Sequence, residues 1–187
     1  AFIYCGLTAV GFLLLLASQV PAFEALCLAF SAISTGGYTV TSGALDGQVN
    51  GLAIAILAAI TFIGASNIAY LRNLVSRHET GLNMEPLAMI AAIAALAFLF
   101  FLGTAHVAGP HHVIADAIFV VTTTGFTVSN SAGHVPLAAV LAAMIGGAVA
   151  STAGGLKISR LVILSRTALA ELARMAHPSG IVSVKFR

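Results

Sequence analysis

The feature that most restricts the fold of this chain is a set of apolar stretches without a charged residue. They cover 17 to 20 positions each, at 1–17, 51–70 and 86–103. An apolar helix of about 20 residues crosses the hydrocarbon core of a bilayer. Only 7% of the 187 residues are charged, whereas soluble domains have roughly 25%. The sequence therefore predicts an all-α, multi-pass membrane protein.

The placement of basic residues predicts which segments share a side of the membrane. None of the eight Lys and Arg residues falls in 18–50 or 104–136. They lie instead in the loop at 72–85 and from position 157 onward. Because cytoplasmic segments are enriched in Lys and Arg, we expect that loop and the C-terminal tail in the cytoplasm. The two segments without basic residues are then expected outside.

One short polar phrase occurs twice. "STGGYTV" at 34–40 returns as "TTTGFTV" at 122–128, offset by 88 residues. Each copy has the same order, with an apolar helix, a shorter apolar helix that opens near a proline, the polar phrase and a second apolar helix. This internal repeat predicts two copies of one unit, at 1–78 and 79–187.

The shorter helices are expected at 22–33 and 111–121. At 1.5 Å per residue they measure about 16 to 18 Å, too short for a core of about 30 Å, so they must enter the membrane and turn back. Irregular backbone at that depth must be buried or line a wet cavity. Gly37 and Gly125 can adopt a positive φ, and carbonyls aligned in this way can replace the hydration shell of a monovalent cation. For one copy alone, a helix C-cap and turn is the alternative.

The second apolar helix differs between the copies. The later copy has six residues fewer in its outer loop and six more within the helix, in "GGAVASTAGGLK" at 146–157. The part before this stretch, 136–150, would be roughly 22 Å long as a helix, too short to cross alone. A further helix is expected to resume near Leu156. Such interruptions are typical of transport sites.

Together, "FEALCLAFSAISTGGYTV", "VVTTTGFTV" and "IGGAVASTAGGLKISRLVIL" resemble the Trk/Ktr/HKT superfamily of potassium transporters, most closely its bacterial Trk-type membrane subunit. In that family, four non-identical units of helix, re-entrant pore helix, filter loop and helix surround one pore. The two units here resemble the second and third. We therefore expect a fragment that lacks the first and fourth repeats, the alternative being that two chains supply four units.

The resemblance implies two groups of functional residues. Backbone carbonyls of the two phrases would bind potassium as the transported ion, with no other cofactor. These filter residues are Thr35, Gly36, Gly37, Tyr38, Thr123, Thr124, Gly125 and Phe126. The interrupted helix would supply an intramembrane gate with glycine hinges. These gate residues are Gly146, Gly147, Ser151, Thr152, Gly154, Gly155 and Lys157.

Asp116 and Lys157 are charged residues of the predicted membrane region whose roles need an explanation. Asp116 lies in the second short helix, where a carboxylate is costly unless it is paired or near a cation. We expect it to brace the filter by hydrogen bonds, the alternative being an ion ligand. Lys157 would raise a barrier to cations near the gate or, alternatively, snorkel to the cytoplasmic interface.

The resemblance thus implies potassium uptake across the plasma (inner) membrane, and no enzyme activity is expected. The family implies a homodimer with a cytosolic nucleotide-binding regulatory subunit, and no nucleic-acid partner is expected. One alternative is a sodium-coupled or sodium-conducting transporter of the same architecture. A less favoured one is an intramembrane enzyme that uses Ser and Thr residues or a cluster of histidines on the outer side, which could also form a metal site. These histidines are His106, His111, His112 and His134.

Overall fold

The computed structural model describes residues 2–68, 72, 84–104, 109–128 and 137–176. Within these residues every regular element is a helix, so the predicted all-α class is confirmed there. The elements are α1 (Phe2–Ala17), α2 (Ala22–Ile33), the 3-10 helix η1 (Leu45–Gly47), α3 (Gly51–Gly64), α5 (Met84–Thr104), α6 (Pro110–Val121), α7 (Leu137–Ile145) and α8 (Ile158–Ala176).

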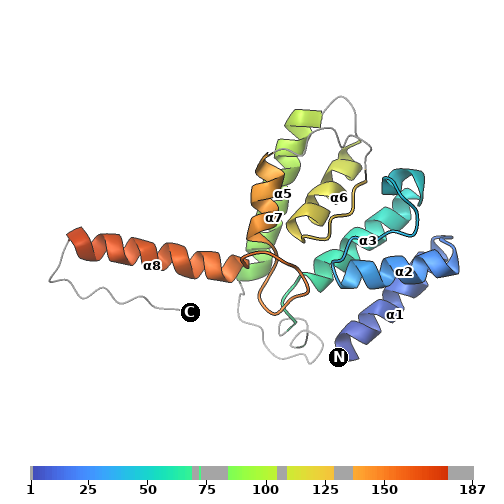
Figure 1. Cartoon of the computed structure of the whole chain (residues 1–187), viewed down its shortest axis with the longest axis horizontal. Coiled ribbons are helices and arrows are strands. Elements are labelled where there is room, and N and C mark those ends of the chain that lie inside the picture. The colour runs from blue at the N-terminus through green and yellow to red at the C-terminus, as the bar shows by residue number, and fades with distance from the viewer. Residues whose placement is uncertain (1, 69–71, 73–83, 105–108, 129–136, 177–187) are drawn as a thin grey trace.

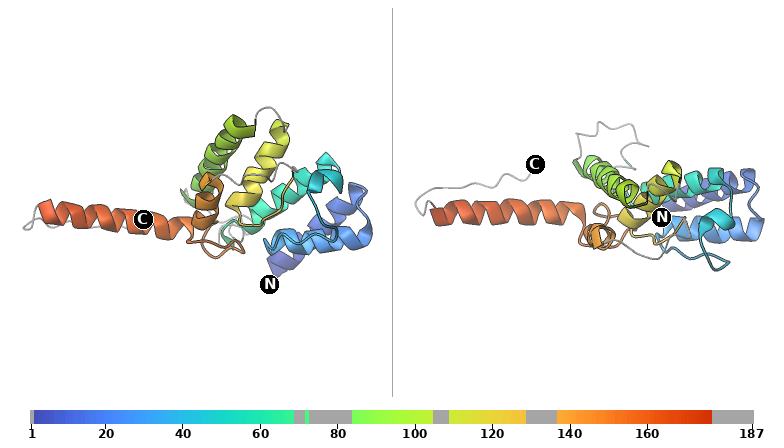
Figure 2. Two further views of the ribbon diagram at one scale, coloured as in Figure 1. Left: turned by 45° about the horizontal axis from the view of Figure 1, so that its top comes forward. Right: turned by 90° about the horizontal axis from the view of Figure 1, so that it is seen from above.

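The helices form two groups of three, with α1, α2 and α3 in one and α5, α6 and α7 in the other (Figure 1). Each group contains a first helix, a short helix and a second helix in chain order. The groups contact each other through α3 and α6. Helix α8 touches α5 and then extends away from both groups, as all the views show (Figures 1 and 2).

The two short helices have the predicted boundaries to within one residue. Pro21 is the N-cap residue of α2, and Pro110 is the first residue of α6. Both positions suit proline, because its fixed φ fits a helix start and its missing N–H would have no partner there. Each helix has 12 residues and ends with a C-cap residue in the αR conformation, Ser34 in α2 and Thr122 in α6.

Apolar packing holds the short helices in place. Leu28 of α2 is fully buried together with Leu15 of α1 and Leu57 of α3. The same core contains Phe119 of α6 and Phe126 of the second polar phrase, so the two groups share it. This shared core positions the ends of α2 and α6 relative to each other, because close-packed interiors tolerate little displacement.

Apolar side chains also cover the outside of the helices. Leu13 of α1, Phe98 of α5 and Leu137 of α7 are 62%, 61% and 73% exposed. Helices occupy the ranges of the three predicted spans, although α3 stops at Gly64. Among the residues described, however, none of the helices qualifies as long and apolar enough to traverse a bilayer, so these predicted spans are not confirmed.

The interrupted helix breaks earlier than predicted. A helix was expected over 136–150, but α7 ends at Ile145. The backbone leaves the helix at Gly146, which adopts a φ of 73°, a value that a right-handed helix cannot accommodate. The amide of Ala148 then pairs with the carbonyl of Ala65, outside its own helix. A helix does resume after the break, at Ile158.

Candidate functional site: two polar turns and the loop beneath them

The two polar phrases begin with the same turn. In each, the amide of the second residue after the C-cap donates to the carbonyl five residues before that residue. The amide of the first residue after the C-cap donates to the carbonyl three residues before that residue. The bonds are Gly36 N to Ser31 O (2.8 Å), Thr35 N to Ala32 O (3.2 Å), Thr124 N to Phe119 O (2.9 Å) and Thr123 N to Val120 O (3.0 Å). This is the Schellman arrangement. A helix C-cap, considered above for one copy, thus describes the start of both phrases.

Residues of positive φ recur at matched positions in the phrases. Gly37 and Gly125 have φ values of 69° and 81°, as their predicted role requires. Two residues before them, Thr35 and Thr123 have φ values of 52° and 57°. A β-branched residue is a genuine outlier there, and such strain costs about 1 to 3 kcal/mol where the surroundings enforce it. Nothing in the sequence predicts this conformation, because threonine disfavours it.

The structure brings the predicted filter residues of the two units together. Gly37 lies against the carbonyl of Thr124 so closely that an added Cβ would overlap the oxygen. The chain that follows the first phrase also pairs with the second, because Leu45 N donates to Thr127 O at 2.9 Å and Asp46 N to Val128 O at 3.2 Å. Two segments about 88 residues apart in sequence thus form one backbone-lined site.

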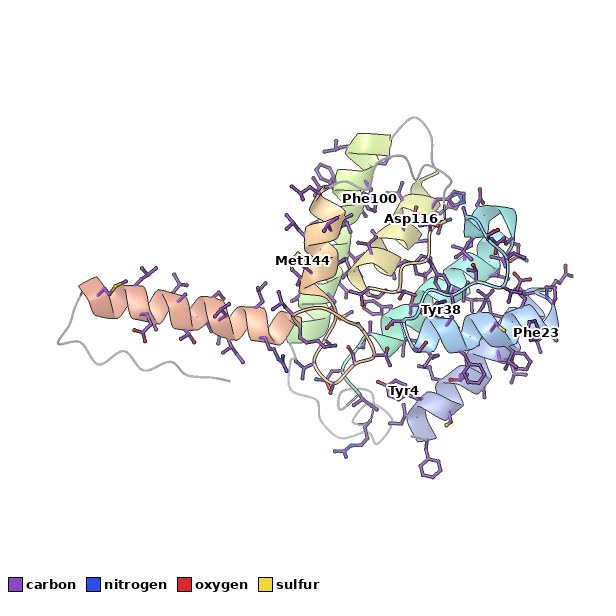
Figure 3. The ribbon with its side chains drawn as sticks, in the orientation of Figure 1. Tyr4, Phe23, Tyr38, Phe100, Asp116 and Met144 are labelled. Carbon is purple, nitrogen blue, oxygen red and sulfur yellow. The ribbon has the colours of Figure 1, made fainter. Side chains whose placement is uncertain are left out.

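The aromatic residue of each phrase is held differently. The amide of Tyr38 donates to Ser31 Oγ at 2.6 Å, and the Tyr38 ring is 80% exposed (Figure 3). Phe126 is 3% exposed and packs edge-on against Phe119, with ring centroids 5.3 Å apart. The repeat offset relates Ser31 to Phe119 and Tyr38 to Phe126. The same positions therefore stabilise one phrase by a hydrogen bond and the other by an aromatic contact.

Asp116 braces the second phrase, as predicted. Its Oδ1 accepts a 2.7 Å hydrogen bond from the amide of Val128, a residue whose side chain is fully buried. Figure 3 shows Asp116 on α6, the helix that leads into this phrase. The matching position in α2 is Leu28, which has no polar group to offer. The carboxylate brace is thus specific to the second unit.

We expect Asp116→Ala to destabilise the second phrase by about 2 kcal/mol, because it removes the acceptor of a buried amide. Asp116→Asn is the matched control, since its side-chain carbonyl can still accept from Val128. The measurement is the unfolding free energy of both variants of the full-length parent protein. Equal losses in the two would show that the charge, and not the accepted hydrogen bond, is what matters.

The 146–157 loop is tied to the end of α3. Thr152 donates to the Gly64 carbonyl through both its hydroxyl (3.0 Å) and its amide (3.3 Å). Ala148 N donates to Ala65 O at 3.1 Å. Within the loop, Ser151 Oγ donates to Ala148 O at 2.6 Å. The loop thereby satisfies carbonyls that the end of α3 leaves unpaired.

The four predicted hinge glycines differ in conformation. Gly146 and Gly155 have φ values of 73° and 85° and lie against each other, so that a Cβ on either would collide with backbone of the other. Gly147 and Gly154 do not have a positive φ. Lys157, with a φ of 70°, donates from Nζ to the Ala153 carbonyl. Its ammonium group is thus held by the loop itself.

The loop also reaches both polar phrases. Thr35 Oγ1 donates to the Thr152 carbonyl at 3.0 Å. Gly154 N donates to Thr123 Oγ1 at 2.7 Å. The predicted filter and gate residues, which the resemblance treats as two groups, therefore form one hydrogen-bonded site.

The predicted outer histidines form no metal centre in the part of the chain that is described. His112 Nε2 lies 3.3 Å from Asp46 Oδ1, and the rings of His111 and His112 are 4.2 Å apart. His106 and His134 fall outside the described residues. Among those described, no three His, Cys, Asp or Glu side chains gather as a metal site would require.

Comparison with known proteins shows similarity along almost the whole chain. No family model matches. The Trk system potassium uptake protein TrkH of Halomonas elongata is 27% identical over 198 residues, and that of Salmonella typhimurium 28% over 200 residues. Each alignment covers 98% of this chain and 41% of the relative.

A crystal structure shares the fold. The potassium transporter TrkH from Vibrio parahaemolyticus superimposes with a TM-score of 0.84 at 24% identity, over 98% of this chain and 42% of that one. The present chain thus spans about two fifths of the length of these proteins. It is similar over nearly its entire length to part of the TrkH-type potassium uptake proteins, which confirms the family resemblance that its motifs indicated.

Proposed function

We propose that this chain supplies two units of a Trk-type membrane protein that takes up potassium ions. One observation carries the proposal: two short helices end in turns of the same conformation, and these turns lie against each other. Its second support is the similarity to TrkH proteins, whose names state potassium uptake. Their names as transporters also favour transport over an intramembrane enzyme.

The proposed filter consists of Thr35 to Tyr38 and Thr123 to Phe126. Positive φ values at alternate residues support this role, because such a backbone can turn successive carbonyl groups toward one side, as a cation filter requires. Carbonyl oxygens directed at one point replace the water that a potassium ion loses on entry. Units 1–78 and 79–187 would each provide one of four such strands, and the first and fourth repeats of the parent chain would complete the ring.

The proposed setting is the plasma (inner) membrane, with the filter turns outside and the basic loop and tail in the cytoplasm. Exposed apolar side chains on every helix group support it. Large apolar side chains exposed in such number are costly in water, and lipid or the proposed neighbouring repeats would cover them. In the same proposal, two such proteins pair and bind a cytosolic nucleotide-binding regulatory subunit, as the family resemblance implies.

The proposed gate is the 146–157 loop. Its contacts with both filter turns support this role, because a loop bonded there can obstruct a path between them. The left-handed glycines Gly146 and Gly155 would act as hinges. Lys157 would hold a positive charge near the path, which favours cation exclusion while the loop is in place.

The test is rubidium uptake, with sodium competition, by a potassium-uptake-deficient bacterium that expresses the full-length parent protein. We expect Gly125→Asp to lose uptake or its discrimination against sodium, because a carboxylate would project into the open space beside this residue. Gly43→Asp is the matched control, since Gly43 also has a positive φ and room for a side chain but lies outside the filter. A wild type that moves no cation contradicts the proposal, and sodium uptake without rubidium favours the sodium-conducting alternative.

A further inference from the structure

We propose that the hydroxyl groups of Thr35 and Thr123 latch the 146–157 loop to the filter turns, so that the loop can leave only when both bonds break. The inference rests on the proposed function, because filter and gate are roles assigned there. The inference names the residues that couple the proposed gate to the proposed filter.

The latch has two points of attachment on one short piece of the loop. Thr35 Oγ1 donates to the carbonyl of Thr152 at 3.0 Å, and Thr123 Oγ1 accepts from the amide of Gly154 at 2.7 Å. Thr35 and Thr123 occupy the same position in the two repeats. One donates and the other accepts, so the backbone of 152–154 is held in a fixed register between the turns.

Backbone strain at both threonines supports a role for their side chains. Each occupies the turn position that glycine normally takes, at φ values of 52° and 57°. Glycine would form the same Schellman turn without strain. What threonine supplies there, and glycine cannot, is a hydroxyl group, and in both turns that hydroxyl bonds the loop.

The Thr35 hydroxyl also has a second acceptor, which makes the latch reversible. Besides the Thr152 carbonyl at 3.0 Å, the carbonyl of Ser34 lies 2.7 Å from Oγ1. A hydroxyl has only one proton to donate, so the two acceptors compete for it. When the loop leaves, the proton turns to Ser34 and no buried donor is left unpaired, which lowers the cost of opening.

The experiment measures how readily the loop opens. In the full-length parent protein, with Cys5, Cys27 and any other cysteine replaced, Ala153→Cys serves as the reporter, because Ala153 is 3% exposed within the loop. Its rate of reaction with a water-soluble thiol reagent reports the fraction of time that the loop is released. Thr35→Val and Thr123→Val remove each hydroxyl while they keep the branched shape and its strain.

Thr123→Val should react about 5-fold faster than the wild type, as expected for the loss of one hydrogen bond. Thr35→Val should react faster than the wild type by a smaller factor, because the Ser34 carbonyl already competes for its hydroxyl proton, and the double variant should react faster than either. Thr35→Ser and Thr123→Ser keep the hydroxyl and should react at the wild-type rate. Thr8→Val is the matched control, because the Thr8 hydroxyl bonds Tyr4 within α1. If the valine variants fail to fold, Thr35→Ala and Thr123→Ala replace them, since alanine carries less strain at a positive φ.

Rubidium uptake by the same cells separates the two proposals. Unchanged reporter rates in folded variants that lack the hydroxyls overturn the latch, even where the wild type conducts. Equal acceleration by the serine variants overturns it as well, because the hydroxyl would then be irrelevant. A wild type that moves no rubidium overturns the proposed function, whereas the reporter rates still decide whether the hydroxyls hold the loop.

Discussion

Replacing Gly37 with alanine should abolish rubidium uptake by the full-length parent protein and destabilise the filter turns by about 3 kcal/mol. Two causes add. A φ of 69° is strained for any residue with a Cβ, and the new methyl group would overlap the carbonyl oxygen of Thr124. That oxygen belongs to the facing turn, so the overlap can be relieved only if the two turns separate. The measurements are uptake and the thermal unfolding midpoint.

Gly125→Ala is the matched control for this prediction. Gly125 has a similar φ of 81°, but no atom lies within 4 Å of its added Cβ. Gly125→Ala therefore introduces the backbone strain without the steric overlap, and we expect it to destabilise the filter turns by about 1 to 2 kcal/mol. The difference between the two variants isolates the contact between the turns. Equal losses would contradict the close approach of Gly37 to Thr124.

Features of the filter turns that depend on local chemistry could be predicted from the sequence. Prolines marked the starts of α2 and α6, and the glycines Gly37 and Gly125 marked the residues of positive φ. The carboxylate brace of Asp116 followed from the cost of leaving such a group unpaired in an apolar setting. Each of these features depends on a residue type that can adopt only a few conformations or environments.

Features that depend on contacts between distant segments could not be predicted. The left-handed conformations of Thr35 and Thr123 oppose the preference of threonine and exist only because neighbouring segments enforce them. The early end of α7 is similar, because Ala148 bonds the carbonyl of Ala65 and so leaves its helix. Whether a segment such as α3 spans a bilayer also depends on where the helix stops, which apolar composition does not determine.

The second turn retains the backbone of the first while its supports differ. Ser31 and Phe119 occupy one matched position, yet the first accepts a hydrogen bond and the second packs an aromatic ring. The backbone bonds of the residues at 34–36 and 122–124, by contrast, correspond in both turns, and the second turn adds a bond from Gly125 N to Phe119 O at 3.3 Å. A proposed ring of carbonyls is expected to keep the backbone geometry while the side chains vary. The ion contacts the backbone, and the side chains only hold that backbone in place.

Gly146→Ala should release the 146–157 loop and leave the filter turns intact. The added Cβ would overlap the carbonyl oxygen of Gly154 and come within 2.8 Å of Gly155 Cα, and the φ of 73° adds strain. Closing the loop would then cost about 3 kcal/mol more, which raises the open fraction roughly 100-fold. The Ala153→Cys reporter should therefore react far faster.

Gly146 lies in the loop and not in either turn, so rubidium should still be preferred over sodium in Gly146→Ala while uptake increases. Gly43→Ala is the matched control, because Gly43 has a φ of 121° with its nearest neighbouring atom 3.7 Å from the added Cβ. It should change neither the reporter rate nor uptake. If Gly146→Ala instead loses discrimination between the ions, the loop is part of the selective site and the separation of gate from filter is wrong. If uptake falls while the reporter rate rises, the released loop blocks conduction, and the loop in its latched position is the conducting arrangement.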